Sequence, residues 1–184
     1  MPVEQRYTAP EPGRLRARRG ALTTMLRAAI AAACGVTLPA AAAVVEIGET
    51  APALRGRLFD GSAFDLAQWR GRVVLVNFYS SYCSICAHEI GNIEAVQEQL
   101  GAKGLQVLMV SIDPPDDLER TRRFVDNYNL PGTMAATLDA SGFERRYPTP
   151  TCYVVDRDGI VREKLTGAKT GGFYRAAVLP LLAP

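Results

Sequence analysis

The stretch "FYSSYCSICAHEIGN" (Phe78–Asn92) places two cysteines three positions apart, between two contrasting patterns. The residues that lead into it, "RVVLVNFYS" (Arg72–Ser80), form a continuous run of mostly β-branched and aromatic side chains, which predicts a strand covered on both faces. From residue 84 to residue 100, apolar side chains recur at spacings that share one face of a helix. The sequence therefore predicts that Cys83 and Cys86 lie at the junction of a buried strand and a helix.

A cysteine pair of this spacing can be a metal-binding site, a structural disulfide or a redox-active pair, and its position in the fold distinguishes these three functions. A helix N-terminus carries about half a positive charge and several unpaired N–H groups. A thiolate at Cys83 should therefore be stabilised, with a lowered pKa. Cys86 lies one turn further along, on the buried face, where it can reach Cys83 but is sheltered from solvent. One accessible attacking thiol and one sheltered thiol predict thiol–disulfide exchange.

Composition and charge exclude several other classes of protein. The chain has 184 residues, of which 48% are hydrophobic and 22% charged, as is typical of a globular protein rather than a disordered one. Residues 1–43 hold six arginines and two acids, so the remainder of this +2 chain is slightly acidic. We therefore expect no binding to nucleic acid. The single histidine, His88, is too few for most catalytic metal sites, and we expect no metal and no cofactor.

Residues 1–43 have the layout of an export signal, with arginines first, then a weakly apolar stretch, a proline and a run of alanines. Small residues at Ala41 and Ala43 fit a cleavage site. Three alternatives remain open: an uncleaved membrane anchor over residues 28–45, a twin-arginine signal at "RRGAL", and a lipoprotein site ending at Cys34. Each of them takes the rest of the chain out of the reducing cytosol, where a cysteine pair readily forms a disulfide.

Residues 44–184 are enough for one hydrophobic core and predict one α/β domain. A hairpin that turns at Asp60–Gly61 precedes the strand at 72–80. After the first helix we expect a strand at 105–113, a helix at 114–130, a strand at 132–139, a short helical piece at 140–147, a hairpin at 151–167 and a helix at 170–183. This order predicts a central mixed β-sheet with helices on both faces and an N-terminal β-hairpin extension.

Several segments resemble the TlpA/ResA-like thiol–disulfide oxidoreductases, which are exported bacterial proteins with a thioredoxin-like fold. The segments are "VVLVNFYSSYCSICAHEI", "VSID", "YPTPTCYVVDRDG" and the N-terminal hairpin, and the resemblance covers almost all of residues 48–182. The motif of that family reads Trp-Cys-x-x-Cys-x-x-Glu-x-Pro. Here Tyr82 replaces the tryptophan, Ser84 replaces a common proline and Gly91 replaces the last proline, while the cysteines and the glutamate match. These departures bear on the subfamily and the redox potential rather than on the exchange chemistry.

Glu89 lies three residues beyond Cys86 and should point to the same side of the helix. Spacing alone leaves open an ordinary surface glutamate. The resemblance implies a half-buried carboxylate with a raised pKa, which takes the proton of Cys86 as that thiol attacks a mixed disulfide. His88 should turn toward solvent, with a docking or pKa-tuning role as the alternative.

The resemblance also implies a substrate-binding set. Pro150 would be a cis-proline packed against the disulfide, with a rigid trans turn as the alternative. A cis bond there turns the backbone of Thr149 toward the site, where its N–H and C=O can pair with a substrate strand. Tyr82, next to Cys83, completes the set. Cys152 is expected to be a buried, inert thiol, and a third redox cysteine is the alternative.

These features predict an exported thiol–disulfide oxidoreductase that reduces protein disulfides. Strong oxidants often carry a basic residue between the cysteines, whereas Ser84 and Ile85 bring no charge. The resemblance implies a periplasmic monomer, a membrane thiol carrier as electron donor, and apocytochrome c or copper-site cysteines as clients. The alternatives are a copper-binding module that uses Cys83, Cys86 and His88, and a peroxiredoxin-like peroxidase.

Overall fold

The structure of the protein is a computed structural model that describes residues 45–130, 134–143 and 148–183. The chain divides into two units, and the second of them, Ala40–Pro184, contains every described residue. The export signal predicted at residues 1–43, with Cys34, lies outside the described residues. Within the described ranges, none of the helices has the length and apolar character needed to cross a membrane.

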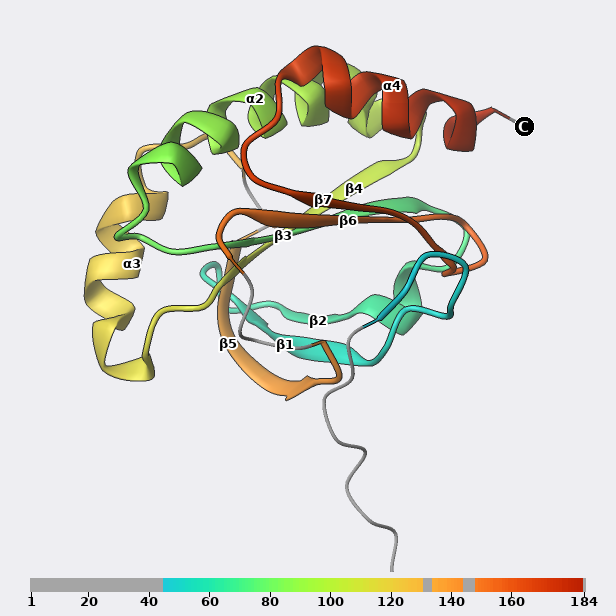
Figure 1. The fold of residues 1–184 in the computed structure, drawn as a ribbon. Coiled ribbons are helices and arrows are strands. Elements are labelled where there is room, and N and C mark those ends of the chain that lie inside the picture. The colour runs from blue at the N-terminus through green and yellow to red at the C-terminus, as the bar shows by residue number, and fades with distance from the viewer. Residues whose placement is uncertain (1–44, 131–133, 144–147, 184) are drawn as a thin grey trace, which may run out of the picture. The chain divides into compact units, whose positions relative to one another are not determined.

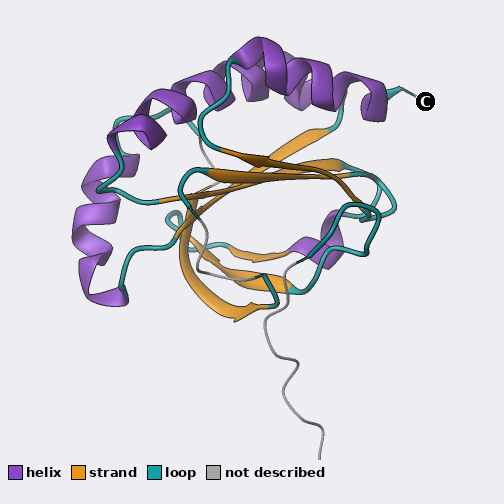
Figure 2. Ribbon diagram, viewed as in Figure 1, coloured by secondary structure: helices purple, strands orange, loops and turns teal. Residues whose placement is uncertain are grey.

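Seven strands form one mixed sheet in the order β2-β1-β5-β4-β3-β6-β7 (Figures 1 and 2). Strand β3 lies between β4, with which it pairs in parallel, and β6, with which it pairs antiparallel. The β4–β5 pair is also parallel, and the other pairs are antiparallel. The strands are β1 (Leu54–Leu58), β2 (Ala63–Asp65), β3 (Val73–Tyr79), β4 (Leu105–Ser111), β5 (Met134–Ser141), β6 (Thr151–Val155) and β7 (Val161–Thr166).

Two long helices lie side by side over one face of the sheet, as Figure 1 shows. Helix α2 (Ser84–Leu100) follows the loop after β3 and has the span that the sequence predicts. Helix α4 (Gly171–Leu182) closes the described chain, and α3 (Leu118–Val125) stands at one end of the sheet. The described residues also include three short 3-10 helices, η1 (Leu66–Trp69), η2 (Gly101–Lys103) and η3 (Pro115–Asp117).

Strand β3 is buried along its whole length and divides the core into two layers. Because successive side chains of a strand point to opposite faces, Leu75 and Tyr79 pack with α2 and α4, whereas Val76 and Phe78 pack with the β1–β2 hairpin. This two-sided burial is what the continuous apolar run predicts. Asn77, a polar residue in this strand, shares the face of Leu75 and Tyr79 and therefore lies under α2.

One local prediction was wrong. The helical piece expected at 140–147 does not form at its start, because β5 continues to Ser141, which pairs with Leu54 of β1; residues 144–147 lie outside the described residues. The predicted mixed sheet flanked by helices is observed. Helices α2 and α4 cover one face, and the β1–β2 hairpin and η1 supply apolar side chains to the other layer of the core. Trp69 of η1 stacks there on Phe64, with 6.1 Å between ring centroids.

Candidate active site

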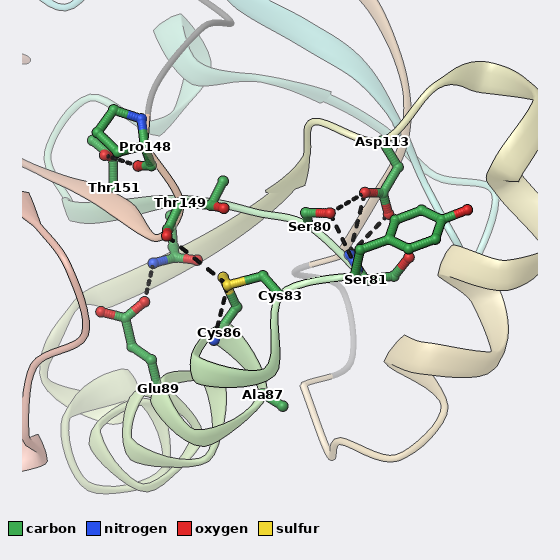
Figure 3. Close-up of a disulfide and its surroundings, with 12 residues drawn as sticks. Ser80, Ser81, Cys83, Cys86, Ala87, Glu89, Asp113, Pro148, Thr149 and Thr151 are labelled. Atoms are coloured by element: carbon green, nitrogen blue, oxygen red, sulfur yellow. Dashed lines mark hydrogen bonds between the residues drawn. A yellow bond between two sulfur atoms is a disulfide. The ribbon is translucent and has the colours of Figure 1, made fainter.

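Cys83 and Cys86 lie where β3 leads into α2, as the sequence predicts. Cys83 is the residue before the helix, and its Sγ accepts a hydrogen bond from the backbone N–H of Cys86 at 3.2 Å. The two residues form a disulfide, with their Cα atoms 5.2 Å apart (Figure 3). Cys86 is 0% exposed, whereas Cys83 is only half-buried. The N–H groups and the dipole of α2 therefore act on the one sulfur of the pair that solvent can reach.

This asymmetry predicts how the reduced protein reacts with an alkylating agent. Cys83 should be labelled rapidly at pH values well below about 8.5, the reference pKa of a free thiol, because the helix N-terminus stabilises its thiolate. Cys86 should be labelled slowly. Cys152, which is free and fully buried, serves as an internal standard that reacts only on unfolding. Mass spectrometry of samples quenched across a pH series measures the order, and labelling of Cys86 before Cys83 would contradict the assignment.

The loop before Cys83 is held by the carboxylate of Asp113, which follows β4. Asp113 accepts hydrogen bonds from the hydroxyl of Ser80 at 2.5 Å and the backbone N–H of Ser81 at 3.0 Å (Figure 3). It also accepts one from the hydroxyl of Thr121 at 2.9 Å. Burial acts to raise the pKa of Asp113, but these hydrogen bonds outweigh it, so its pKa is lowered. An ionised Asp113 thus fixes the chain that presents Cys83.

Tyr82 lies on the surface beside Cys83, with 60% of its side chain exposed. Its hydroxyl donates to a carboxylate oxygen of Asp117 at 3.1 Å, and the guanidinium of Arg120 lies 3.9 Å from the centre of its ring. Both partners belong to the η3–α3 region. Tyr82 therefore forms an exposed aromatic surface next to the accessible sulfur, supported from one side by α3.

The segment before β6 approaches Cys83 from the other side. The peptide bond between Thr149 and Pro150 is cis, and the carbonyl oxygen of Thr149 lies 3.9 Å from Sγ of Cys83 (Figure 3). Pro150 is buried, and the hydroxyl of Thr151 ties the segment by donating to the carbonyl of Pro148 at 2.6 Å. The structure thus brings Thr149 and its neighbour Pro150 to Cys83, although Thr149 lies 66 residues after Cys83 in the sequence.

Glu89 lies on the same face of α2 as Cys86 and is only 1% exposed. Its Oε2 accepts a hydrogen bond from the side-chain amide of Asn77 at 3.0 Å. Its Oε1 accepts from the backbone N–H of Lys169 at 3.2 Å and from the hydroxyl of Tyr174. Burial raises the pKa of Glu89, and the three hydrogen bonds oppose that rise without cancelling it. Such a carboxyl group can accept and release a proton, and Glu89 lies one helical turn from Cys86 on the buried face of α2.

His88 and Cys152 are placed as predicted. His88 is exposed and lies on the face of α2 that points to solvent. Cys152 is a free cysteine, 0% exposed, and lies opposite Asn77 in the β3–β6 pair. Burial raises the pKa of the Cys152 thiol well above its ordinary value, and the charge of Glu89 adds to the rise. A neutral, enclosed thiol of this kind is a poor nucleophile.

Sequence reasoning missed the three groups that hold Glu89. Asn77 carried a usable signal, because a polar side chain inside a fully buried strand requires a hydrogen-bond partner. Lys169 and Tyr174 lie 80 and 85 residues away from Glu89 in the chain. Nothing in their local sequence marks them as its partners.

Comparisons with known proteins agree with this geometry. The family model described as the AhpC/TSA family matches residues 47–164, more than half of the chain, so the chain belongs to this family. It is 28% identical to the thioredoxin-like protein YneN of Bacillus subtilis over 130 residues, which are 68% of this chain and 75% of that protein. It is 25% identical to the thiol-disulfide oxidoreductase ResA of Geobacillus thermodenitrificans over 162 residues, which are 83% of this chain and 90% of that one.

The fold is that of a solved thiol:disulfide interchange protein of the thioredoxin family from Chlorobium tepidum. The TM-score is 0.64 at 19% identity, and the match covers 76% of this chain and all of that one. The thioredoxin-like fold and the TlpA/ResA-like resemblance predicted from the sequence are confirmed. So is the prediction of a thioredoxin-like Cys-x-x-Cys oxidoreductase, since Cys83 and Cys86 lie at disulfide distance.

Proposed function

We propose that this member of the AhpC/TSA family is an exported oxidoreductase that reduces disulfides of client proteins. The observation that carries the proposal is the unequal burial of two linked sulfurs, with Cys83 half-buried at the start of α2 and Cys86 0% exposed. Only one of these sulfurs can meet a client. The other can complete the exchange inside the protein.

The proposed cycle consists of two exchanges. The thiolate of Cys83 attacks a client disulfide, forms a bond to one client sulfur, and releases the other as a thiolate that takes up a proton. Cys86 then gives its proton to Glu89 and attacks Cys83. The Cys83–Cys86 bond forms as the Cys83–client bond breaks, and the second client sulfur leaves as a thiolate that takes up a proton from Glu89 or from water. The client has then gained two electrons and holds two thiols. A membrane thiol carrier returns two electrons to the oxidised protein by the reverse exchange.

The surface around Cys83 suits an extended segment of a client. The carbonyl of Thr149, 3.9 Å from the Cys83 sulfur, is placed to pair with a client backbone in the manner of an added β-strand. Tyr82 and Ile85, which lie close to Cys83 in the sequence, are 60% and 54% exposed and offer apolar contacts to a client. The cis bond to Pro150 sets the direction of the Thr149 carbonyl, and we assign a substrate-binding role to Thr149, Pro150 and Tyr82.

Export to the periplasm, or to the outer face of the inner membrane, is proposed from the pattern of residues 1–43, which would be either a cleaved signal or a membrane anchor. In that compartment a disulfide reductase has two classes of client that need reduced cysteines, apocytochrome c and copper-binding proteins. An antioxidant role would follow from the same chemistry. We propose that the protein acts as a monomer.

A reductant must have a low reduction potential, and this predicts a measurable value. Ser84 and Ile85 place no positive charge between the cysteines, so the Cys83 thiolate lacks the extra stabilisation that makes a strong oxidant. We expect a potential nearer to that of thioredoxin, about −270 mV, than to the value of about −120 mV that marks a strong oxidant. Equilibration with glutathione or dithiothreitol buffers measures it. A potential above about −180 mV, the value for an isomerase, would refute the reductant role.

The two alternative functions, a peroxidase and a copper-binding module, would require other properties of Cys83, Cys86 and His88. A peroxiredoxin-like alignment would assign the peroxide-reactive role to Cys86, which is fully buried, so peroxide turnover without a partner thiol is not expected. A copper site would need His88 beside the two cysteines. Over the described residues, no group of three His, Cys, Asp or Glu side chains is arranged to hold a metal. Stoichiometric copper binding by the reduced protein would favour that alternative.

A further inference from the structure

Tyr174, from the C-terminal helix α4, is hydrogen-bonded to the carboxylate of Glu89. Its side chain is fully buried between α4 and the sheet, and its hydroxyl donates to Oε1 of Glu89. The other buried side chains of α4, Val178 and Leu182, are aliphatic, so packing of the helix does not require a hydroxyl. A buried hydroxyl is costly unless it is hydrogen-bonded, and the Tyr174 hydroxyl has the Glu89 carboxylate as its acceptor, with the Cys152 thiol as a second polar neighbour.

Each element packed around Glu89 contributes a polar or titratable group. Strand β3 contributes the amide of Asn77, and the loop before α4 contributes the backbone N–H of Lys169. The Lys169 ammonium donates to two backbone carbonyls of its own loop, while its charge still favours an ionised carboxylate. Strand β6 contributes the Cys152 thiol, which also interacts with the Tyr174 hydroxyl, and Cys86 of α2 belongs to the same buried cluster as Tyr174 and Cys152.

Among these groups, the Tyr174 hydroxyl is the donor that can be removed with least disturbance. Asn77 lies in the central strand, and Lys169 donates through its backbone, whereas phenylalanine at position 174 keeps the packing of the ring. A hydrogen bond to an ionised carboxylate stabilises the anion and so opposes the effect of burial on the pKa of Glu89. Tyr174 keeps its own proton, because burial and its neighbours Cys152 and Glu89 all raise its pKa.

We propose that Tyr174 is a positioning residue that holds the Glu89 carboxylate and keeps it able to accept the proton of Cys86. The inference rests on the proposed function only in assigning that proton to Glu89. Without the hydroxyl, Glu89 stays protonated to higher pH. Over that range the attack of Cys86 on the mixed disulfide loses its base.

Carbon-13 NMR of the oxidised, glutamate-labelled protein tests the positioning directly, because Cys83 and Cys86 do not titrate in that state. The Glu89 resonance is assigned by its loss in Glu89→Gln. We expect Tyr174→Phe to raise the titration midpoint by about one pH unit, a tenfold change in proton affinity. An unmoved midpoint would overturn the proposal.

Tyr79→Phe is the matched control. Tyr79 is also fully buried in the α2-side layer, and its hydroxyl has no hydrogen-bond partner among the described residues. Removal of that hydroxyl should leave the Glu89 midpoint unchanged. An equal shift in both variants would mean that the loss of any buried hydroxyl moves the midpoint, which also overturns the specific role of Tyr174.

Incorporation of 3-fluorotyrosine at all seven tyrosines should shift the Glu89 titration midpoint in the opposite direction to Tyr174→Phe. This experiment keeps the proposal testable if Tyr174→Phe fails to fold. Fluorine makes the phenol more acidic and therefore a stronger hydrogen-bond donor. The Glu89 midpoint should then fall below that of the unlabelled protein. A midpoint that rises or stays unchanged contradicts the proposal.

The kinetics of disulfide reduction separate this inference from the function on which it rests. The acidic side of the pH–rate profile should move upward by about one pH unit in Tyr174→Phe, in step with the NMR midpoint. In a protein that already carries Glu89→Gln, the additional change Tyr174→Phe should not shift the pH–rate profile. An NMR shift without a kinetic shift overturns the proton-accepting role of Glu89, whereas an unmoved NMR midpoint overturns the positioning role of Tyr174.

Discussion

A Cys86→Ala variant will accumulate as covalent adducts with its clients, joined through Cys83, and will lose steady-state turnover. In the wild-type protein the second exchange is intramolecular, and well-oriented intramolecular groups act at effective concentrations of about 10⁵–10⁸ M. In the variant the mixed disulfide must wait for a thiol from solution. We therefore expect turnover of a protein disulfide to fall at least about a thousandfold, measured by the rate at which client thiols appear.

The adducts identify the client as well as the mechanism. Non-reducing gels and mass spectrometry of variant protein recovered from cells should show partners that dithiothreitol releases. Two matched variants control the result. Cys83→Ala keeps Cys86, which is 0% exposed, and a Cys83→Ala/Cys86→Ala double variant keeps only the buried Cys152 in the domain. Neither should form adducts. Trapping by Cys83→Ala at the level seen for Cys86→Ala would reverse the roles of the two cysteines.

Much of the fold followed from local patterns. The continuous apolar run before the cysteines predicted the central strand β3, and the spacing of apolar residues in the next segment predicted α2 to its observed ends. Both signals are local, because each records which side chains one element buries. The error at residues 140–147 has the same origin. The end of β5 is held by its pairing with β1, about 85 residues earlier in the chain, and no local pattern records that contact.

The site also contains residues that local sequence predicted and residues that only tertiary contacts bring to it. Cys83, Cys86 and Glu89 lie within seven residues on one helix start, so spacing alone predicted that they share a face. The approach of Thr149 to Cys83 was implied by resemblance and not by any pattern in "YPTPT". The partners of Glu89 come from β3, from the loop before α4 and from α4 itself. A carboxylate buried by tertiary contacts needs donors from other elements, and only the folded chain identifies which ones it has.

Glu89→Gln should slow client reduction by about 10²–10⁴-fold, the usual contribution of a positioned acid–base group. The size of glutamine matches that of glutamate, and the neighbouring Asn77 can accommodate the new amide. Its Oδ1 is buried without a hydrogen-bond partner among the described residues, so a rotated Asn77 amide can accept from the glutamine. We therefore expect the variant to fold normally and to lose rate. Glu98→Gln, an exposed change on the same helix, is the matched control and should react at the wild-type rate.

The role of Glu89 as a base also predicts how the rate of client reduction changes with pH. Because burial raises the pKa of Glu89, the wild-type rate should fall as the pH drops through that raised pKa, where the carboxylate is protonated and cannot accept the proton of Cys86. The rate of the glutamine variant should not show this fall.

The stability of the folded protein should change with pH in the opposite direction to the rate. A carboxyl group whose pKa is raised by folding favours the folded state below its unfolded pKa, and this contribution is lost as the pH rises through the folded pKa. Denaturant unfolding across that range should therefore show a loss of stability in the wild type that Glu89→Gln lacks. If the variant and the wild type have parallel rate and stability profiles, Glu89 is not the base for Cys86, and the resolving thiol must lose its proton directly to water.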